Sequence, residues 1–108
     1  MDKIAQVLHW HAPFHPIGKW VEYENQAVID KSNLHFRLLR VGWKNIEHIY
    51  HGVIHIDIKN DKIWIQEDYT KKGVANELTH EGVSKGKQDI VLAFQAPYRR
   101  ADIGFATA

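Results

Sequence analysis

The chain has 108 residues, of which 44% are hydrophobic, with four Trp, four Tyr and four Phe. This length and composition predict a single globular domain over residues 1–108 and exclude a disordered chain. Fourteen Lys and Arg against thirteen Asp and Glu give a net charge of +1, so charge does not indicate the basic face of a strong nucleic-acid binder. The lack of Cys excludes disulfides and thiolate chemistry.

No apolar run approaches the ~20 residues needed to span a bilayer, and the N-terminus lacks the long apolar core of a signal peptide. We therefore expect a cytoplasmic protein without a membrane partner.

The first half of the chain predicts one helix and two strands. Apolar spacing favours a short helix over residues 2–11, and two prolines make 12–19 a connection. Alternating side chains then predict strands over 20–29 and 34–43, joined by a polar turn. Gly42 indicates a bulge or a close backbone approach within the second strand.

A central hairpin is the strongest signal in the sequence. The run YHGVIHIDIKNDKIWIQ alternates, breaks at a short polar turn and resumes, which predicts strands over 47–58 and 62–67. Four successive strands with short links favour an antiparallel meander. Thr70 then fits as the N-cap of a helix that runs to Glu81, and residues 90–94 fit either a fifth strand or a packed loop.

These elements together predict an α+β domain. Its antiparallel sheet of four to five strands is a meander with a central hairpin, and one or two helices pack against it.

Eight His among 108 residues raise the question of a metal site. His51, His55 and Asp57 fall on one face of the predicted third strand, where imidazole and carboxylate groups could serve as ligands. A solvent-exposed strand face explains the same pattern without a metal. The spacing matches no established metal motif, and we expect no cofactor.

Binding residues are sought among exposed aromatic and arginine side chains, because both anchor interfaces. No nucleophile, phosphate-binding loop or catalytic motif is recognisable, so we do not expect an enzyme. The candidates for a partner or phosphate contact are Arg37, Arg40, Trp64, Tyr98, Arg99 and Arg100.

Several segments in a fixed order resemble the XisI family, the fdxN-element excision controlling factors of cyanobacteria. They are LLRVGW at 38–43, HIDIKNDKIWIQEDYTKKGVANELTHEGV at 55–83, IVLAF at 90–94 and the terminal GFATA. The resemblance covers residues 34–108 and is poorer before them, where the chain has a short opening rich in His and Pro.

The resemblance implies an accessory factor in programmed DNA excision during heterocyst differentiation, acting beside a site-specific recombinase. It also implies a companion, the XisH-like protein, which resembles a nuclease-type fold. No catalytic residue is assigned in the family, so none carries over. We expect a regulatory protein that binds an XisH-like partner, with a homodimer as a further form. The alternatives are direct DNA binding in the excision complex and, less favoured, a metal-dependent hydrolase.

Overall fold

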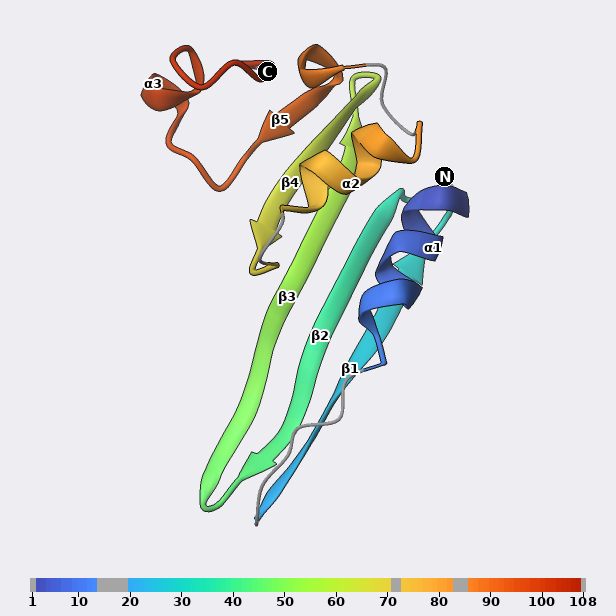
Figure 1. Cartoon of the computed structure of the whole chain (residues 1–108), viewed down its shortest axis with the longest axis vertical. Helices are drawn as coiled ribbons and strands as arrows, with labels where there is room; N and C mark the ends of the chain where they lie inside the picture. The colour runs from blue at the N-terminus through green and yellow to red at the C-terminus, as the bar shows by residue number, and fades with distance from the viewer. Residues whose placement is uncertain (1, 14–19, 71–72, 83–85, 108) are drawn as a thin grey trace.

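A computed structural model of the chain describes residues 2–13, 20–70, 73–82 and 86–107. Five strands form one sheet in the order β1-β2-β3-β4-β5 (Figure 1). The strands are β1 (Val21–Asp30), β2 (His35–Lys44), β3 (Glu47–Lys59), β4 (Lys62–Asp68) and β5 (Ile90–Leu92). The helical segments are α1 (Asp2–His11), α2 (Val74–His80), the 3-10 turn η1 (Lys87–Asp89) and α3 (Pro97–Arg100).

The sheet is mostly antiparallel. Strands β1 to β4 pair in sequence as an antiparallel meander, and β5 pairs in parallel with β4 after the chain has passed through α2 and η1. The predicted α+β fold is confirmed. For residues 90–94 the sequence allowed either a strand or a packed loop, and Ile90–Leu92 form a strand.

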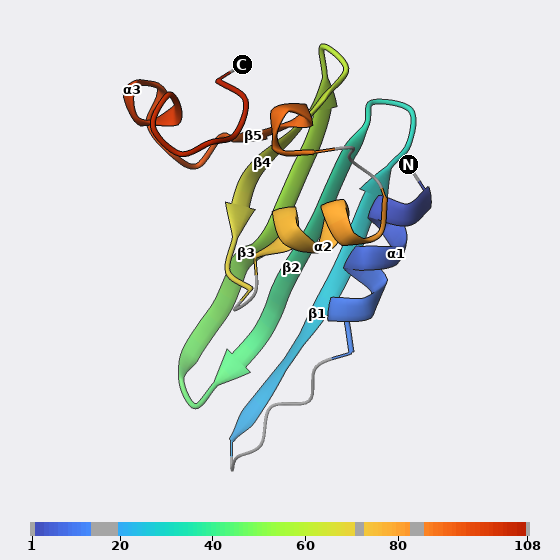
Figure 2. The ribbon, with the colours of Figure 1, turned by 45° about the horizontal axis from the view of Figure 1, so that its top comes forward.

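Helices α1 and α2 lie side by side on one face of the sheet (Figures 1 and 2). Their apolar side chains pack on alternate residues of β2, β3 and β4, which removes this apolar surface from water. The core residues without exposed surface include Val7, Leu8, Phe36, Leu38, Ile54, Ile56, Ile65, Val74 and Leu78. Among the described residues, no helix combines the length and apolar character needed to cross a bilayer.

A β-bulge shifts the pairing of β2 with β3. Leu38 pairs with Ile54 whereas Leu39 pairs with Gly52, so Val53 is the extra residue. Both Val53 and Ile54 are buried. The alternation predicted for this run is therefore wrong at Val53, because an extra residue breaks the period of two locally. At Gly42 the backbone of β1 comes close to β2, which is one of the two roles predicted for this glycine.

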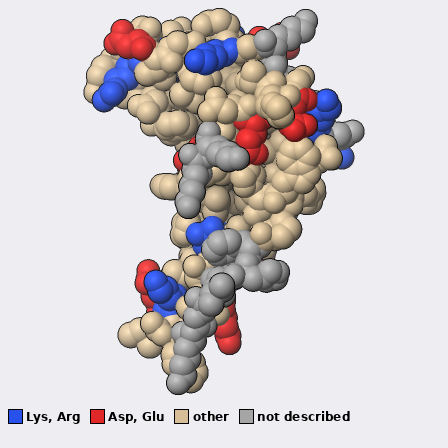
Figure 3. All heavy atoms as spheres, viewed as in Figure 1, with Lys and Arg blue, Asp and Glu red and all other residues tan. Residues whose placement is uncertain are grey.

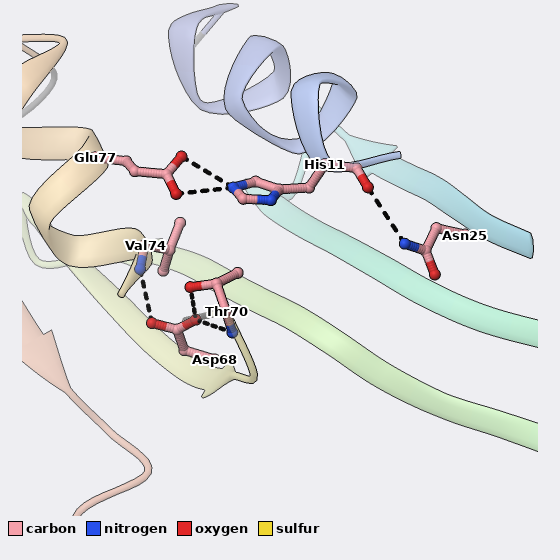
Figure 4. A network of polar contacts seen from close by, with 6 residues as sticks. All are labelled: His11, Asn25, Asp68, Thr70, Val74 and Glu77. Atoms are coloured by element: carbon pink, nitrogen blue, oxygen red, sulfur yellow. Dashed lines mark hydrogen bonds and ion pairs between the residues drawn. The ribbon is translucent and has the colours of Figure 1, made fainter. Parts of the chain in front are cut away.

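The second helix starts later than predicted. Its N-cap is Gly73, whereas Thr70 was predicted. Residues 71 and 72 lie outside the described part. The Thr70 hydroxyl donates a hydrogen bond of 2.5 Å to Asp68 Oδ1, and the amide of Val74 donates one of 2.7 Å to Asp68 Oδ2 (Figure 4). Asp68 thus satisfies a free N–H group of the first helical turn from outside the helix, the task that the prediction gave to Thr70.

The predicted turn after β1 is held by one carboxylate. Asp30 accepts hydrogen bonds from the Asn33 side chain and from the backbone amides of Asn33 and Ser32. The Asn33 side-chain bond, the backbone bonds and the nearby His35 hold the pKa of Asp30 below its usual value of 3.8.

We expect Asp30→Asn to lower stability at neutral pH and to have less effect in acid. A depressed pKa in the folded protein contributes stability above pH 3.8 that is lost as pH falls through the folded value. The measurement is the melting temperature of both proteins from pH 7 down to pH 2. Asp102→Asn, at an exposed position, is the matched control. If the difference in melting temperature between wild type and Asp30→Asn stayed constant from pH 7 to pH 2, the role of the charge would be refuted.

Candidate functional site

The face of the sheet opposite the helices carries three of the candidate functional residues, Arg37, His55 and Asp57. We call it the open face; it is formed by side chains of β1, β2 and β3 that alternate with the core residues. The far ends of these three strands also extend beyond both helices (Figure 1). Within the described residues, this part of the sheet therefore offers surface that no helix covers.

An apolar cluster lies on the open face toward the far end of the β2–β3 hairpin. We call the side chains of Leu39, Val41, Trp43 and Tyr50 the open-face patch. Val41 pairs directly with Tyr50, and the rings of Trp43 and its cross-strand neighbour His48 are 4.8 Å apart. Tyr50 is 65% exposed and Trp43 50% exposed, so large aromatic surface faces solvent.

Two more apolar side chains lie at the same end of the molecule. Ile46 is 96% exposed in the β2–β3 turn, and Trp20 is 69% exposed just before β1. The amide of Asn45 donates a 2.8 Å hydrogen bond to the backbone oxygen of Trp20, which brings the two segments together. A single exposed apolar residue is ordinary, whereas a group of them at one end is typical of a contact surface.

The predicted metal candidates are only partly brought together. His55 Nε2 lies 3.0 Å from Asp57 Oδ1, and a residue that the sequence analysis missed, His35, places its Nδ1 2.6 Å from the same oxygen. His51 lies beyond the bulge, where its ring packs edge-on to Tyr69. Partial burial raises the pKa of Asp57, but the hydrogen bonds and charges of His35 and His55 outweigh it, so this pKa lies below its ordinary value.

The arginines on β2 point to opposite faces. Arg37 is exposed on the open face, where it pairs across the strands with His55. Arg40 lies on the other face, donates a 3.1 Å hydrogen bond to Asn25 Oδ1 and stacks 5.5 Å from the centre of the Tyr23 ring. The two side chains therefore do not form one cationic site.

The C-terminal candidates divide into a packed pair and an exposed pair. Trp64 is 9% exposed beneath Lys59 and Arg100, and the guanidinium of Arg100 donates to the backbone oxygens of Ala93 and Gln95. Tyr98 and Arg99 are exposed on α3. Trp64 and Arg100 thus serve packing in this structure, which leaves the other two available for contact.

Charge is spread over the molecule. On the face drawn in Figure 3, Lys and Arg are mixed with Asp and Glu, and no broad region carries one sign.

A hollow lies between α1 and α2. Two carboxylates and two histidines are among the residues that line it, and His11 Nε2 lies 2.9 Å from both carboxylate oxygens of Glu77 (Figure 4). Opposite charges that pair locally leave little net field for a nucleic acid.

Comparison with known proteins identifies the family. The XisI protein family model matches residues 1–107. The chain belongs to the XisI family. The match includes the N-terminal part, for which the sequence motifs gave little resemblance.

Two solved structures extend this comparison. A XisI-like protein from Anabaena variabilis is 34% identical over 99% of this chain and 94% of its own, with a TM-score of 0.85. The fdxN element excision controlling factor XisI from Anabaena variabilis is 26% identical over 99% of this chain and 91% of its own, with a TM-score of 0.78. No curated protein sequence matches the chain.

Proposed function

We propose that this XisI-family protein is a non-enzymatic controlling factor that acts in the cytoplasm by binding an XisH-like protein in programmed DNA excision. Membership of the family carries the proposal, together with the name of the related structure as an fdxN element excision controlling factor. Exposed aromatic surface on the open face, which neither α1 nor α2 covers, supports binding to a protein.

The open-face patch is the contact surface that we favour. Interfaces are enriched in Trp and Tyr, which contribute large contact area with few rotatable bonds. Leu39, Val41, Trp43 and Tyr50 provide such residues on neighbouring strands of a rigid sheet. Glu22 and Glu24 on β1 border them, pairing with Trp43 and Val41, and form an acidic rim. A partner with an apolar contact region flanked by basic residues would fit this surface.

The test is coexpression with the XisH-like protein encoded nearest to this gene, purification through a tag on one chain and light scattering of the eluate. We expect a stoichiometric complex that Trp43→Ala and Tyr50→Ala weaken at least about tenfold, as for interface anchors. Tyr69→Ala is the matched control because Tyr69 is 72% exposed outside the patch. Failure of the two chains to copurify would refute the pairing.

Light scattering of the chain alone tests self-association. A dimer that Trp43→Ala dissociates would assign the open-face patch to a homodimer. A complex with the XisH-like protein that is lost only on Tyr98→Ala or Arg99→Ala would move the contact to α3.

Direct DNA binding is the alternative, and it makes a different prediction. Arg37, Arg40, Arg99 and Arg100 are spread over β2 and α3, and two of them are engaged within the protein. DNA binding by phosphate contacts would weaken steeply with added salt, by about one power of salt concentration per contact. A retarded complex with this salt dependence in a mobility-shift assay would favour the alternative.

A further inference from the structure

Three potential metal ligands meet on the open face, at the end of the sheet next to the β1–β2 turn. His35 on β2 pairs directly with Asp57 on β3, and His55, two residues before Asp57, lies diagonally across from His35. One ligand atom from each of the three side chains lies within 4.8 Å of the other two. The three come from two paired strands, which hold their Cα positions rigidly.

The donor set is that of an open zinc site. Two imidazole nitrogens and one carboxylate oxygen bind Zn²⁺ at about 2.0–2.2 Å, with the fourth position left to water. Both histidine nitrogens already point at Asp57 Oδ1, at 2.6 and 3.0 Å. An ion would replace these two hydrogen bonds, and small rotations of the imidazole rings would draw the nitrogens together around it.

Charged side chains of both signs surround the cluster. Asp30 pairs with His35 from β1, and Glu67 pairs with His55 from β4, so carboxylates flank the cluster on both sides. The positive neighbours are Arg37, opposite His55, and Lys59, whose ammonium group lies 3.9 Å from the Trp64 ring centre. A third cation, Arg100, lies 5.7 Å from the centre of the same ring. With Asp57 included, three carboxylates face three cations, so the donor set itself, and not an excess of negative charge, would attract the ion.

Solvent can reach the cluster. The side chains of His35, His55 and Asp57 are 46%, 23% and 18% exposed. An ion could therefore enter without opening the fold, and its remaining coordination position would face outward. A hollow beside the cluster, lined by Val28, Asp30, His35 and Arg37, leaves room on that side for water or a small anion.

We propose that His35, His55 and Asp57 form a binding site for Zn²⁺ or a similar divalent transition-metal ion on the open face. The proposal does not depend on the function given above, which makes no use of a metal. It replaces the predicted set of His51, His55 and Asp57 with the residues that the bulge in β3 brings together. A bound ion would also contradict the expectation from the sequence that the protein has no cofactor.

The test uses the full chain, with any affinity tag removed, after dialysis against a chelator. Titration with ZnCl₂ in a melting assay is expected to raise the melting temperature by about 10 °C at a hundredfold excess over the dissociation constant. Titration with CoCl₂ is expected to produce the visible absorption of four-coordinate Co²⁺. Both signals should be lost in His35→Gln and in His55→Gln.

His48→Gln and His51→Gln are the matched controls, because both lie on β3 outside the cluster. They should bind both ions as the wild type does. The proposal is wrong if Zn²⁺ leaves the melting temperature unchanged, or if His35→Gln and His55→Gln bind as tightly as the controls. The Gln variants decide the outcome even if Asp57→Asn fails to fold, since they keep Asp57 and a polar side chain at each position. A negative result here would leave the proposed binding to an XisH-like protein untouched.

Discussion

Gly42→Ala is expected to lower the free energy of unfolding by at least about 3 kcal/mol, and Gly42→Val to prevent folding. Gly42 has a φ of +148°, a conformation that side chains with a Cβ rarely adopt. A Cβ added there would come within 2.7 Å of Tyr23 Cβ and closer still to the backbone of β1. Strand β1 would have to move away from β2. Urea unfolding followed by Trp fluorescence measures the loss.

Gly52→Ala is the matched control on the next strand. A Cβ added at Gly52 meets the carboxylate end of Glu67, which can rotate away, whereas the obstacle at Gly42 is backbone. Gly52→Ala should therefore stay within about 1 kcal/mol of wild type. Equal stability of Gly42→Ala and wild type would show that β1 does not pack as closely as the structure indicates.

Local patterns in the sequence were enough to predict α1 and the four strands of the meander, but not η1 or α3. Side-chain alternation and the polar turns located the ends of β1 to β4 to within one residue, because period and turn chemistry are local properties. At the turn between β3 and β4, Asn60 and Asp61 both have positive φ, as a two-residue hairpin turn requires. The start of α2 was missed because its capping carboxylate, Asp68, belongs to the preceding strand.

The cluster on the open face could not be predicted, because it depends on the bulge. From the β2–β3 turn the pairing begins with Lys44 opposite Glu47, which without interruption would place Phe36 opposite His55. The extra residue at Val53 instead pairs Phe36 with Ile56, so that apolar residues share the core face. The same shift brings His35 opposite Asp57. Gly52, next to Val53, is a residue type that often marks a bulge, but a glycine alone does not fix which pairs shift, so His35 was overlooked.

The second large effect is expected at Leu38. Leu38 has no exposed surface and packs in the core under the helices, so Leu38→Ala should cost about 2–5 kcal/mol through lost burial and the cavity left behind. Its neighbour Leu39 is half-buried on the open face, and Leu39→Ala should cost less than about 1 kcal/mol. Urea unfolding of the two variants compares the two faces of one strand with the same chemical change.

The same pair separates stability from binding. If the open-face patch contacts the partner, Leu39→Ala should weaken the complex while leaving the fold almost intact. Leu38→Ala should destabilise the free protein but, wherever it remains folded, present an unchanged patch and bind as wild type does. Comparable losses of stability in both variants would contradict the assignment of the two faces. Unchanged binding by Leu39→Ala, together with unchanged binding by Trp43→Ala, would remove the open face from the interface.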